Sequence, residues 1–420
     1  MRAREASTPA VKPRDLQVAY GPEAQNPGSR ATGSHVTEIP ESGFLPGPAG
    51  PSGRARLVVA VPARNEEGRI ARTLRALGEQ RGEDAGSYRV VLLANNCTDH
   101  TAARAREVSR SSALPVEVIE EDFPPEQAHI GHARGRALQL AASRLEGRSD
   151  GLLATTDADT VVAPDWASNL RAALGEADLV GGRILTLPEE RDVLPRHLRR
   201  LQLQDAAYHL LASRLRSLID PDPSDPWPRH HQHFGANMGL RLSAWEQVKV
   251  WPQVRCLEDV ALVNEMRRLD LRVRHCPQVR AWTSAREHGR VEVGLSSQLR
   301  EWQELQANGR CWRVPGVPEL RAEARATAAL RRAWTRNQAS DNQSSGAPLA
   351  SLWLVEPGEL QAALDAPTLG RARELAFHAR HESGRWSCQF PPEPLEDALR
   401  GLRAELRLLE RPGEAPKDPD

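Results

Sequence analysis

Lysine is almost absent from this 420-residue chain, because arginine supplies 53 of its 56 basic side chains. Acidic side chains also number 56, so the formal net charge is zero. Proteins that bind nucleic acid or an anionic membrane surface usually carry an excess of basic charge. The sequence therefore predicts neither kind of partner.

Cysteine and long apolar runs are equally scarce. The five cysteines, at positions 97, 256, 276, 311 and 388, form no C-x-x-C pair, which disfavours a disulfide framework or a zinc site and fits a reducing compartment. The apolar run at 57–63 is far shorter than the ~18 residues that cross a bilayer, and the N-terminus has no apolar signal core. We expect a cytoplasmic protein without a transmembrane segment.

Proline and glycine set the first 50 residues apart, since together they fill 13 of these positions. Tyr20 and Phe44 are the only aromatic residues in this segment, so it can bury too little apolar surface to offset the entropy of ordering it. We predict a disordered tail at 1–54, an α/β domain at 55–312, and a small helical C-terminal region at 313–420 with a linker near 337–346.

Short apolar runs alternate with stretches of helical spacing from residue 56 onward. The runs typical of buried strands lie at 57–61, 90–94, 115–120, 151–157 and 177–187. Helical spacing appears at 70–77, 101–110 and 135–145. This alternation predicts an α/β fold with a mainly parallel central sheet flanked by helices. Right-handed crossovers then place the carboxyl ends of the strands at one edge, where such sheets bind ligands.

Apolar residues also recur at helical spacing between positions 194 and 218. They are Leu194, Leu198, Leu201, Tyr208, Leu211, Leu215 and Leu218. This pattern predicts one long helix. Its apolar stripe either faces the core of the molecule or forms the seam of a homodimer.

The tetrapeptide DADT, at 157–160, directly follows the apolar segment GLLATT at 151–156. In an extended chain, residues two apart share one side, so Asp157 and Asp159 would point the same way. Their mutual repulsion would be removed by a hard divalent cation such as Mg²⁺ or Mn²⁺, which can also hold two phosphate groups. The alternative is a pair of solvated loop aspartates.

Two further polar segments follow the first two predicted strands. VPARNEE, at 61–67, ends the first strand and opens a helix, where Asn65 and Glu66 suit either helix capping or ligand binding. NNCTD, at 95–99, repeats the arrangement, and Asn96 and Asp99 could contact a base or ribose or cap the next helix. Neither strand is followed by G-x-G-x-x-G, which disfavours a Rossmann-type dinucleotide site.

A basic segment and an acidic segment complete the set of motifs. HIGHARGRAL, at 129–138, puts His132 and Arg134 at a helix start, where free N–H groups and a guanidinium suit a diphosphate. CLEDVAL, at 256–262, puts Glu258 and Asp259 in the first turn of a helix, where they either complement its dipole or deprotonate an acceptor hydroxyl.

The GAN tripeptide at 235–237 permits close backbone approach at Gly235 and offers the Asn237 amide to sugar hydroxyls. The histidines of HHQHF, which precede this tripeptide, lack a second ligand group at zinc-like spacing. We therefore do not expect a zinc site there.

Taken in their order along the chain, the motifs resemble those of family 2 glycosyltransferases, which bind nucleotide sugars on a GT-A fold. The resemblance covers about residues 56–302. VPARNEE is similar to the P-x-x-N-E segment that meets the nucleotide, GHARGRAL to the segment beside the diphosphate, DADT to the DxD motif and GANMGLR to the acceptor-side G-x-N segment. NNCTD resembles D-x-S-x-D with Asn95 for the first acid, and LEDVAL resembles E-D-x-D-L with Ala261 for the second.

The resemblance implies a role for each matching residue. Asp259 would be the catalytic base, and Asp159 would bind Mg²⁺ or Mn²⁺ with His288 as a late ligand. The acceptor side would comprise Gly235, Asn237 and Glu258. The nucleotide-sugar-binding residues would be Pro62, Ala63, Arg64, Asn65, Glu66, Asn96, Asp99, His132, Arg134, Asp157, Ala158 and Asp159.

The implied reaction moves a sugar from a nucleoside-diphosphate sugar, with uridine favoured over guanosine, to a hydroxyl of an unidentified acceptor. A single base-assisted displacement inverts the anomeric configuration. QLREW, at 298–302, resembles the Q-x-x-R-W of processive synthases, but its arginine and tryptophan are not adjacent, so we expect a non-processive enzyme. The alternatives are a retaining transferase of the glucosyl-3-phosphoglycerate synthase kind, and a non-catalytic nucleotide-sugar-binding scaffold.

Overall fold

The computed structural model describes residues 56–82, 87–248, 251–252, 254–286, 293–339 and 347–410. The predicted tail at 1–54 and the predicted metal ligand His288 lie outside these ranges. Of the predicted linker, residues 337–339 end a long helix, and residues 340–346 also lie outside the described ranges.

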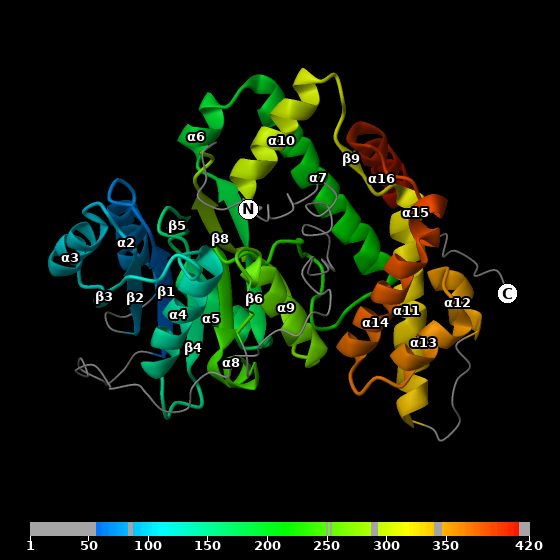
Figure 1. Ribbon diagram of the computed structural model, residues 1–420, viewed down its shortest axis with the longest axis horizontal. Helices are drawn as coiled ribbons and strands as arrows, with labels where there is room; N and C mark the ends of the chain where they lie inside the picture. Colours follow the sequence, from blue (N-terminus) through cyan, green and yellow to red (C-terminus); the bar gives the residue numbers. More distant parts are fainter. Residues whose placement is uncertain are drawn as a thin grey trace, which may run out of the picture.

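An eight-stranded sheet forms the centre of the molecule, with its strands in the order β3-β2-β1-β4-β7-β6-β8-β5 (Figure 1). The strands are β1 (Leu57–Ala63), β2 (Tyr88–Asn95), β3 (Val116–Glu121), β4 (Leu152–Thr156), β5 (Val161–Val162), β6 (Leu179–Thr186), β7 (Asn237–Arg241) and β8 (Val273–Thr283). A separate two-stranded pairing joins β9 (Arg313–Val314) to β10 (Glu393–Pro394). The five strands expected from the sequence are confirmed as β1, β2, β3, β4 and β6.

Six of the eight strands run in one direction, and β5 and β7 run in the opposite direction. β3, β2, β1 and β4 run parallel to one another, and β6 runs parallel to β8. β7 lies between β4 and β6 and runs antiparallel to both, whereas β5 pairs antiparallel with β8. The α/β fold is confirmed, with β7 as a reversed strand that the sequence analysis did not predict. Because of this reversal, β7 begins at the edge where β1, β2 and β4 end.

Helices cover both faces of the sheet. α2 (Ile70–Gly78), α3 (Thr101–Ser111) and α5 (Trp166–Leu174) pack on one face, and α4 (Ile130–Ser143), α8 (Leu242–Gln247) and α9 (Glu258–Arg268) pack on the other. The remaining helices are α6 (Pro188–Val193), α7 (Arg196–Ile219), α10 (Leu295–Ala307), α11 (Val317–Ala339), α12 (Ala347–Trp353), α13 (Pro357–Leu364), α14 (Leu369–Ser383), α15 (Arg385–Gln389) and α16 (Leu395–Leu409).

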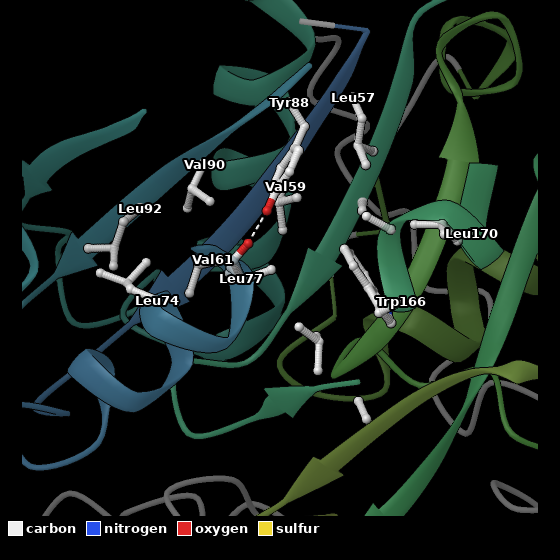
Figure 2. Packing of buried hydrophobic residues seen from close by; sticks show 14 of the residues in the cluster. Leu57, Val59, Val61, Leu74, Leu77, Tyr88, Val90, Leu92, Trp166 and Leu170 are labelled. Carbon is white, nitrogen blue, oxygen red and sulfur yellow. Dashed lines mark hydrogen bonds between the residues drawn. The ribbon is translucent and has the colours of Figure 1, made fainter. Parts of the chain in front are cut away.

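The continuous apolar run of β1 serves both faces, because side chains alternate along a strand. Val59 belongs to the core beneath α2 and α5, whereas Ala60 belongs to the core beneath α4 and α9. Figure 2 shows the first core, in which Trp166 of α5 is fully buried and the hydroxyl of Tyr88 donates a hydrogen bond to the Leu77 carbonyl. A strand covered on both faces thus explains the run at 57–61.

The long helix expected at 194–218 is confirmed as α7, and its apolar stripe packs inside the chain. Leu198 and Leu215 of α7 are buried in a cluster with Leu299 of α10 and Leu402 of α16. Most of the stripe therefore packs against α10 and the C-terminal region, whereas Leu218 near its end is exposed. Figure 1 shows α11 to α16 on the opposite side of the molecule from α2 and α3.

The C-terminal helices have a core of their own, built from α11, α12, α13 and α14. A partly buried carboxylate ties it to α7: Glu323 of α11 accepts from Arg216 of α7 and from Arg380 of α14, both at 3.1 Å. Within the described ranges, no helix is both long and apolar enough to cross a membrane.

Trp166→Phe tests a hydrogen bond that crosses the first core. The indole Nε1–H donates to Oδ1 of Asn237 at 2.7 Å, and both side chains are fully buried. Phenylalanine fills most of the ring volume but leaves the amide oxygen without this donor, so the free energy of unfolding should fall by about 1–3 kcal/mol. Urea denaturation measures the change. Trp227→Phe at an exposed tryptophan should cost less than about 0.5 kcal/mol, and equal losses would contradict the assignment.

Candidate active site

A cavity of about 530 Å³ lies at the edge of the sheet where β1, β2 and β4 end and β7 begins. α7 and α10 close its far end. The structure brings most of the predicted site residues to this cavity. Its lining includes Pro62, Ala63, Arg64, Glu66, Arg134, Asp157, Ala158, Asp159, Gly235, Glu258 and Asp259.

Arg134 of α4 links the segments that surround the cavity. Its Nε donates to Glu258 Oε1 at 2.7 Å, and its Nη2 donates to Asp157 Oδ1 at 2.8 Å. Its Nη1 donates to the Thr155 hydroxyl and to the Gly235 carbonyl, both at 3.0 Å. Arg134 is only 3% exposed and Glu258 only 2%. The guanidinium is therefore a buried bridge between protein groups rather than a freely exposed anion binder.

Glycine at position 235 allows the Arg134 guanidinium to approach the chain so closely. A Cβ at this position would lie 2.3 Å from the central carbon of the guanidinium, which is shorter than any tolerable contact. Burial lowers the pKa of Arg134, but Asp157, Glu258 and Asp259 more than offset that effect and raise the pKa overall. The bridge therefore stays charged.

Asp259, in the first turn of α9, faces the same cavity. Its Oδ2 accepts from the Gly235 N–H at 2.7 Å and its Oδ1 from the Val260 N–H at 2.8 Å. Burial is the main reason that the pKa of Asp259 is raised to about 7, and the neighbouring Glu258 adds to it, while Arg134 and the two N–H donors oppose it. A carboxylate with this pKa changes protonation near neutral pH.

Asp159 forms a second acidic group with Glu66, and Arg286 lies between them. Nη2 of Arg286 is 2.9 Å from Asp159 Oδ2 and 2.9 Å from Glu66 Oε1. Burial and the charge of Asp157 raise the pKa of Asp159 to about 7, while Arg286 opposes the rise. Three carboxylates thus converge on one end of the cavity.

These oxygens have the chemistry that a hard divalent cation prefers. A guanidinium already occupies the space between Asp159 and Glu66, which shows that a positive charge fits there. No group of three or more His, Cys, Asp or Glu side chains in the described ranges is arranged to hold a metal ion by itself. A cation at Asp159 would therefore need oxygen atoms of a bound ligand or of water to complete its coordination.

The loop residues Asn65 and Asn96, for which we predict contact with the nucleotide, are not among the residues that line the cavity. Their φ angles, 52° and 47°, lie in the left-handed region that asparagine tolerates better than most residues. Asn65 Oδ1 accepts from the Thr98 N–H at 2.7 Å, and Asn96 Nδ2 donates to the Phe123 carbonyl at 2.8 Å. Both side chains hold loops in place at the ends of β1 and β2.

Asp99 is a third predicted nucleotide-binding residue outside the cavity lining. Its carboxylate accepts from the N–H groups of Glu67 at 3.1 Å and Thr101 at 3.0 Å. Thr101 is the first residue of α3. Asp99 therefore holds the turn before α3, whose N-cap residue, His100, makes no capping hydrogen bond with its side chain.

His132 and Asn237 are the other two predicted site residues that point away from the cavity. The ring of His132 packs edge-on against Phe123, with ring centroids 4.6 Å apart. Asn237 is fully buried, and its amide is satisfied inside the protein. It accepts from Trp166 and donates to the carbonyls of Arg183 at 3.1 Å and Val279 at 3.0 Å. Asn237 begins β7, and its amide links this strand to α5, β6 and β8.

Several cavity residues were not predicted from the sequence. Arg286 is one, and its only signal was its place in SAREHGR beside His288. The far end is lined by Asp205 and His209 of α7, and the ring of His209 stacks on that of His231 with centroids 4.2 Å apart. The i, i+4 spacing of Asp205 and His209 places them on one face of the helix. That spacing is the signal that could have found them.

Arg134→Met tests the buried bridge. The change removes the partner of Glu258 and leaves that carboxylate buried without it, so the free energy of unfolding should fall by about 3–5 kcal/mol. Arg136→Met is the matched control on the same helix, because Arg136 pairs with Glu121 at 2.6 Å in a more exposed position and should lose only about 0–1 kcal/mol. Thermal and urea unfolding of both variants measures the difference, and equal losses would contradict the bridge's importance.

Residues 58–245 match the model of the family described as glycosyl transferase family 2. A search of curated proteins finds no match for the sequence.

Solved structures that resemble the chain include three glycosyltransferases. A mannosyltransferase from Pyrobaculum calidifontis, in complex with GDP-Man and Mn²⁺, is 16% identical over 86% of this chain and 89% of that chain, with a TM-score of 0.40. S. aureus TarS in complex with UDP-GlcNAc is 15% identical over 79% and 91%, with a TM-score of 0.40. Glucosyl-3-phosphoglycerate synthase from Mycobacterium tuberculosis, in complex with Mn²⁺, UDP and phosphoglyceric acid, is 15% identical over 63% and 83%, with a TM-score of 0.36.

Proposed function

We propose that this chain, whose residues 58–245 match the glycosyl transferase family 2 model, is an inverting, non-processive and metal-dependent glycosyltransferase. It moves a sugar from a nucleoside-diphosphate sugar to a hydroxyl group of its acceptor. The observation that carries the proposal is the placement of Asp259 in the same cavity as Asp157 and Asp159. A general base and carboxylates that can bind a cation thus line the cavity in which donor and acceptor would meet.

Asp259 is proposed as the general base. A base works best when its pKa is close to the working pH, and burial raises the pKa of Asp259 to about 7. Two backbone N–H groups fix the orientation of its carboxylate. When ionised, it takes the proton of the acceptor hydroxyl, whose oxygen then attacks the anomeric carbon from the face opposite the leaving diphosphate. One such displacement inverts the anomeric configuration.

The donor is proposed to bind at the other end, between the loop after β1 and the loop after β4. Asp159 would hold Mg²⁺ or Mn²⁺ there, and the cation would stabilise the negative charge of the departing diphosphate. Arg64 lines this end, and its Nη1 donates to the Ala128 carbonyl at 3.0 Å, which joins the loop after β1 to the loop before α4. Asp157 is kept in place by Arg134.

The acceptor is proposed to lie between Asp259 and the face of α7. Asp205 and His209 line that end of the cavity, and Gln298 and Trp302 of α10 lie there too. Burial raises the pKa of Asp205 and lowers that of His209. These groups can accept hydrogen bonds from the hydroxyl groups of the acceptor substrate or donate hydrogen bonds to them.

Asp259→Asn separates binding from chemistry. Asparagine keeps the volume of the side chain but cannot take a proton, so turnover should fall by about 10²- to 10⁴-fold while donor affinity changes little. In the unchanged enzyme, turnover should decline as the pH falls below about 7, because protonation removes the base, and the variant should lack this decline. Release of nucleoside diphosphate across a pH series measures both effects.

Glu265→Gln is the matched control for Asp259→Asn. Glu265 lies on the same helix, pairs with Arg268 at 2.7 Å and does not line the cavity, so turnover should stay unchanged. The anomeric configuration of the product is the deciding second measurement. Near-normal turnover of Asp259→Asn with a retained configuration would contradict the base assignment and support the retaining alternative.

Asp159→Asn tests the metal site. With Mn²⁺ present, UDP or GDP at 100 times its dissociation constant should stabilise the unchanged protein by about 2.7 kcal/mol. The variant should lose this Mn²⁺-dependent stabilisation, because the neutral amide holds the cation poorly. Asp150→Asn, at an exposed aspartate that pairs with Arg56, should keep it. The same titrations compare uridine, which we favour, with guanosine, and a variant that behaves like the unchanged protein would contradict the site.

A further inference from the structure

Arg286 joins three segments of the donor end that are far apart in the sequence. It follows β8, whereas Asp159 follows β4 and Glu66 follows β1. A single nitrogen of its guanidinium, Nη2, lies 2.9 Å from one carboxylate oxygen of each partner. The guanidinium therefore occupies the space between the two carboxylates.

The environment of this contact is largely closed to water. The side chains of Asp159 and Glu66 are 10% and 5% exposed, and that of Arg286 is 25% exposed. Asp157 lies close enough to add its negative charge. Buried carboxylates in such proximity repel one another strongly unless a positive charge compensates them. Arg286 supplies that charge from within the chain.

A divalent cation at Asp159 would compete directly with this arrangement. The oxygen that such a cation needs is part of the carboxylate that Arg286 already contacts. Mg²⁺ binds oxygen at about 2.0–2.1 Å, so the ion and the guanidinium would be two positive charges within a few ångströms of each other. Coulomb repulsion at that separation is large in a partly buried site. Movement of the guanidinium away from Asp159 would relieve this repulsion.

We propose that Arg286 is an internal counter-cation which a divalent metal must displace from Asp159, so that the metal binds well only together with the donor diphosphate. This inference rests on the proposed function, because it takes Asp159 as the metal's protein ligand. The diphosphate carries negative charge that can receive the displaced guanidinium, and its oxygens complete the metal's coordination. Without the diphosphate, the displaced guanidinium has no new partner of this kind.

The consequence is a thermodynamic coupling between metal and nucleotide. If the nucleotide raises the affinity for the metal by some factor, the metal raises the affinity for the nucleotide by the same factor. Such couplings usually amount to about 5- to 150-fold. Removing the positive charge of Arg286 should remove much of this coupling, because the metal alone no longer has a competitor.

The experiment measures Mn²⁺ binding to the full chain by the electron paramagnetic resonance signal of free Mn²⁺. Titrations are run without nucleotide, with UDP and with GDP, on the unchanged protein and on Arg286→Gln. Without nucleotide, the variant should bind Mn²⁺ about 5- to 150-fold more tightly than the unchanged protein. The ratio between affinities with and without nucleotide should shrink correspondingly.

Two further variants serve as controls. Arg286→Lys keeps a positive charge at the site and should bind Mn²⁺ alone as weakly as the unchanged protein. Arg280→Gln removes an exposed arginine of β8, which pairs with Asp165 at 3.4 Å and does not line the cavity, and should also behave like the unchanged protein. Melting temperature and circular dichroism verify that each variant is folded.

Failure of this inference and failure of the proposed function give different results. If the unchanged protein binds Mn²⁺ with nucleotide, but Arg286→Gln gains no affinity for Mn²⁺ alone, the role of Arg286 is overturned and the metal site stands. If Mn²⁺ binds neither to the unchanged protein with nucleotide nor to Arg286→Gln, the metal site itself is overturned, and the role of Arg286 with it.

Discussion

The buried guanidinium of Arg134 is the interaction on which the rest of the site depends. It contacts the end of β4, the loop before β7 and the first turn of α9 at the same time. Removing such a charge from water costs several kcal/mol, and it is tolerated only when carboxylates and hydrogen-bond acceptors surround it. That requirement draws Asp157 and Glu258 toward one point, and Asp259 follows Glu258 into the cavity. This ion bridge thus positions Asp157 and Glu258, while Arg286 joins Asp159 to Glu66.

The two carboxylates with the most distinctive environment, Asp159 and Asp259, lie on either side of this bridge. The pKa of each is raised to about 7, mainly by burial, and each has a second acid next to it: Asp157 in one case and Glu258 in the other. In the proposed reaction these two carboxylates have different roles. The negative charge near Asp159 attracts a cation, and the raised pKa of Asp259 favours proton uptake from a hydroxyl. Gathering so much like charge in one cavity lowers the stability of the fold, and such a departure is typical of a functional site.

The predicted polar motifs meet around the cavity, but only some residues of each motif line it. In VPARNEE, Glu66 lines the cavity, whereas Asn65 supports a loop through its hydrogen bond to Thr98. In HIGHARGRAL, Arg134 points toward Glu258 at the cavity, whereas His132 packs against Phe123. Neighbouring residues on a helix point about 100° apart and those on a strand point to opposite faces, so a motif always divides between site and support. Only the packing of the neighbouring elements decides which member serves the site.

The sequence by itself determined the alternation of strands and helices, the placement of polar segments after the strands, and the resemblance to a glycosyltransferase family. These features depend on residues close together in the chain, whose apolar periodicity and turn chemistry can be read directly. Only the tertiary structure decided the reversed direction of β7, the burial of Asn237 and the position of Arg286 between Asp159 and Glu66. Each of these depends on segments that are distant in sequence meeting in space. Arginine is so abundant in this chain that composition cannot show which guanidinium will reach which carboxylate, because charge pairing is set by the approach of folded elements rather than by local pattern.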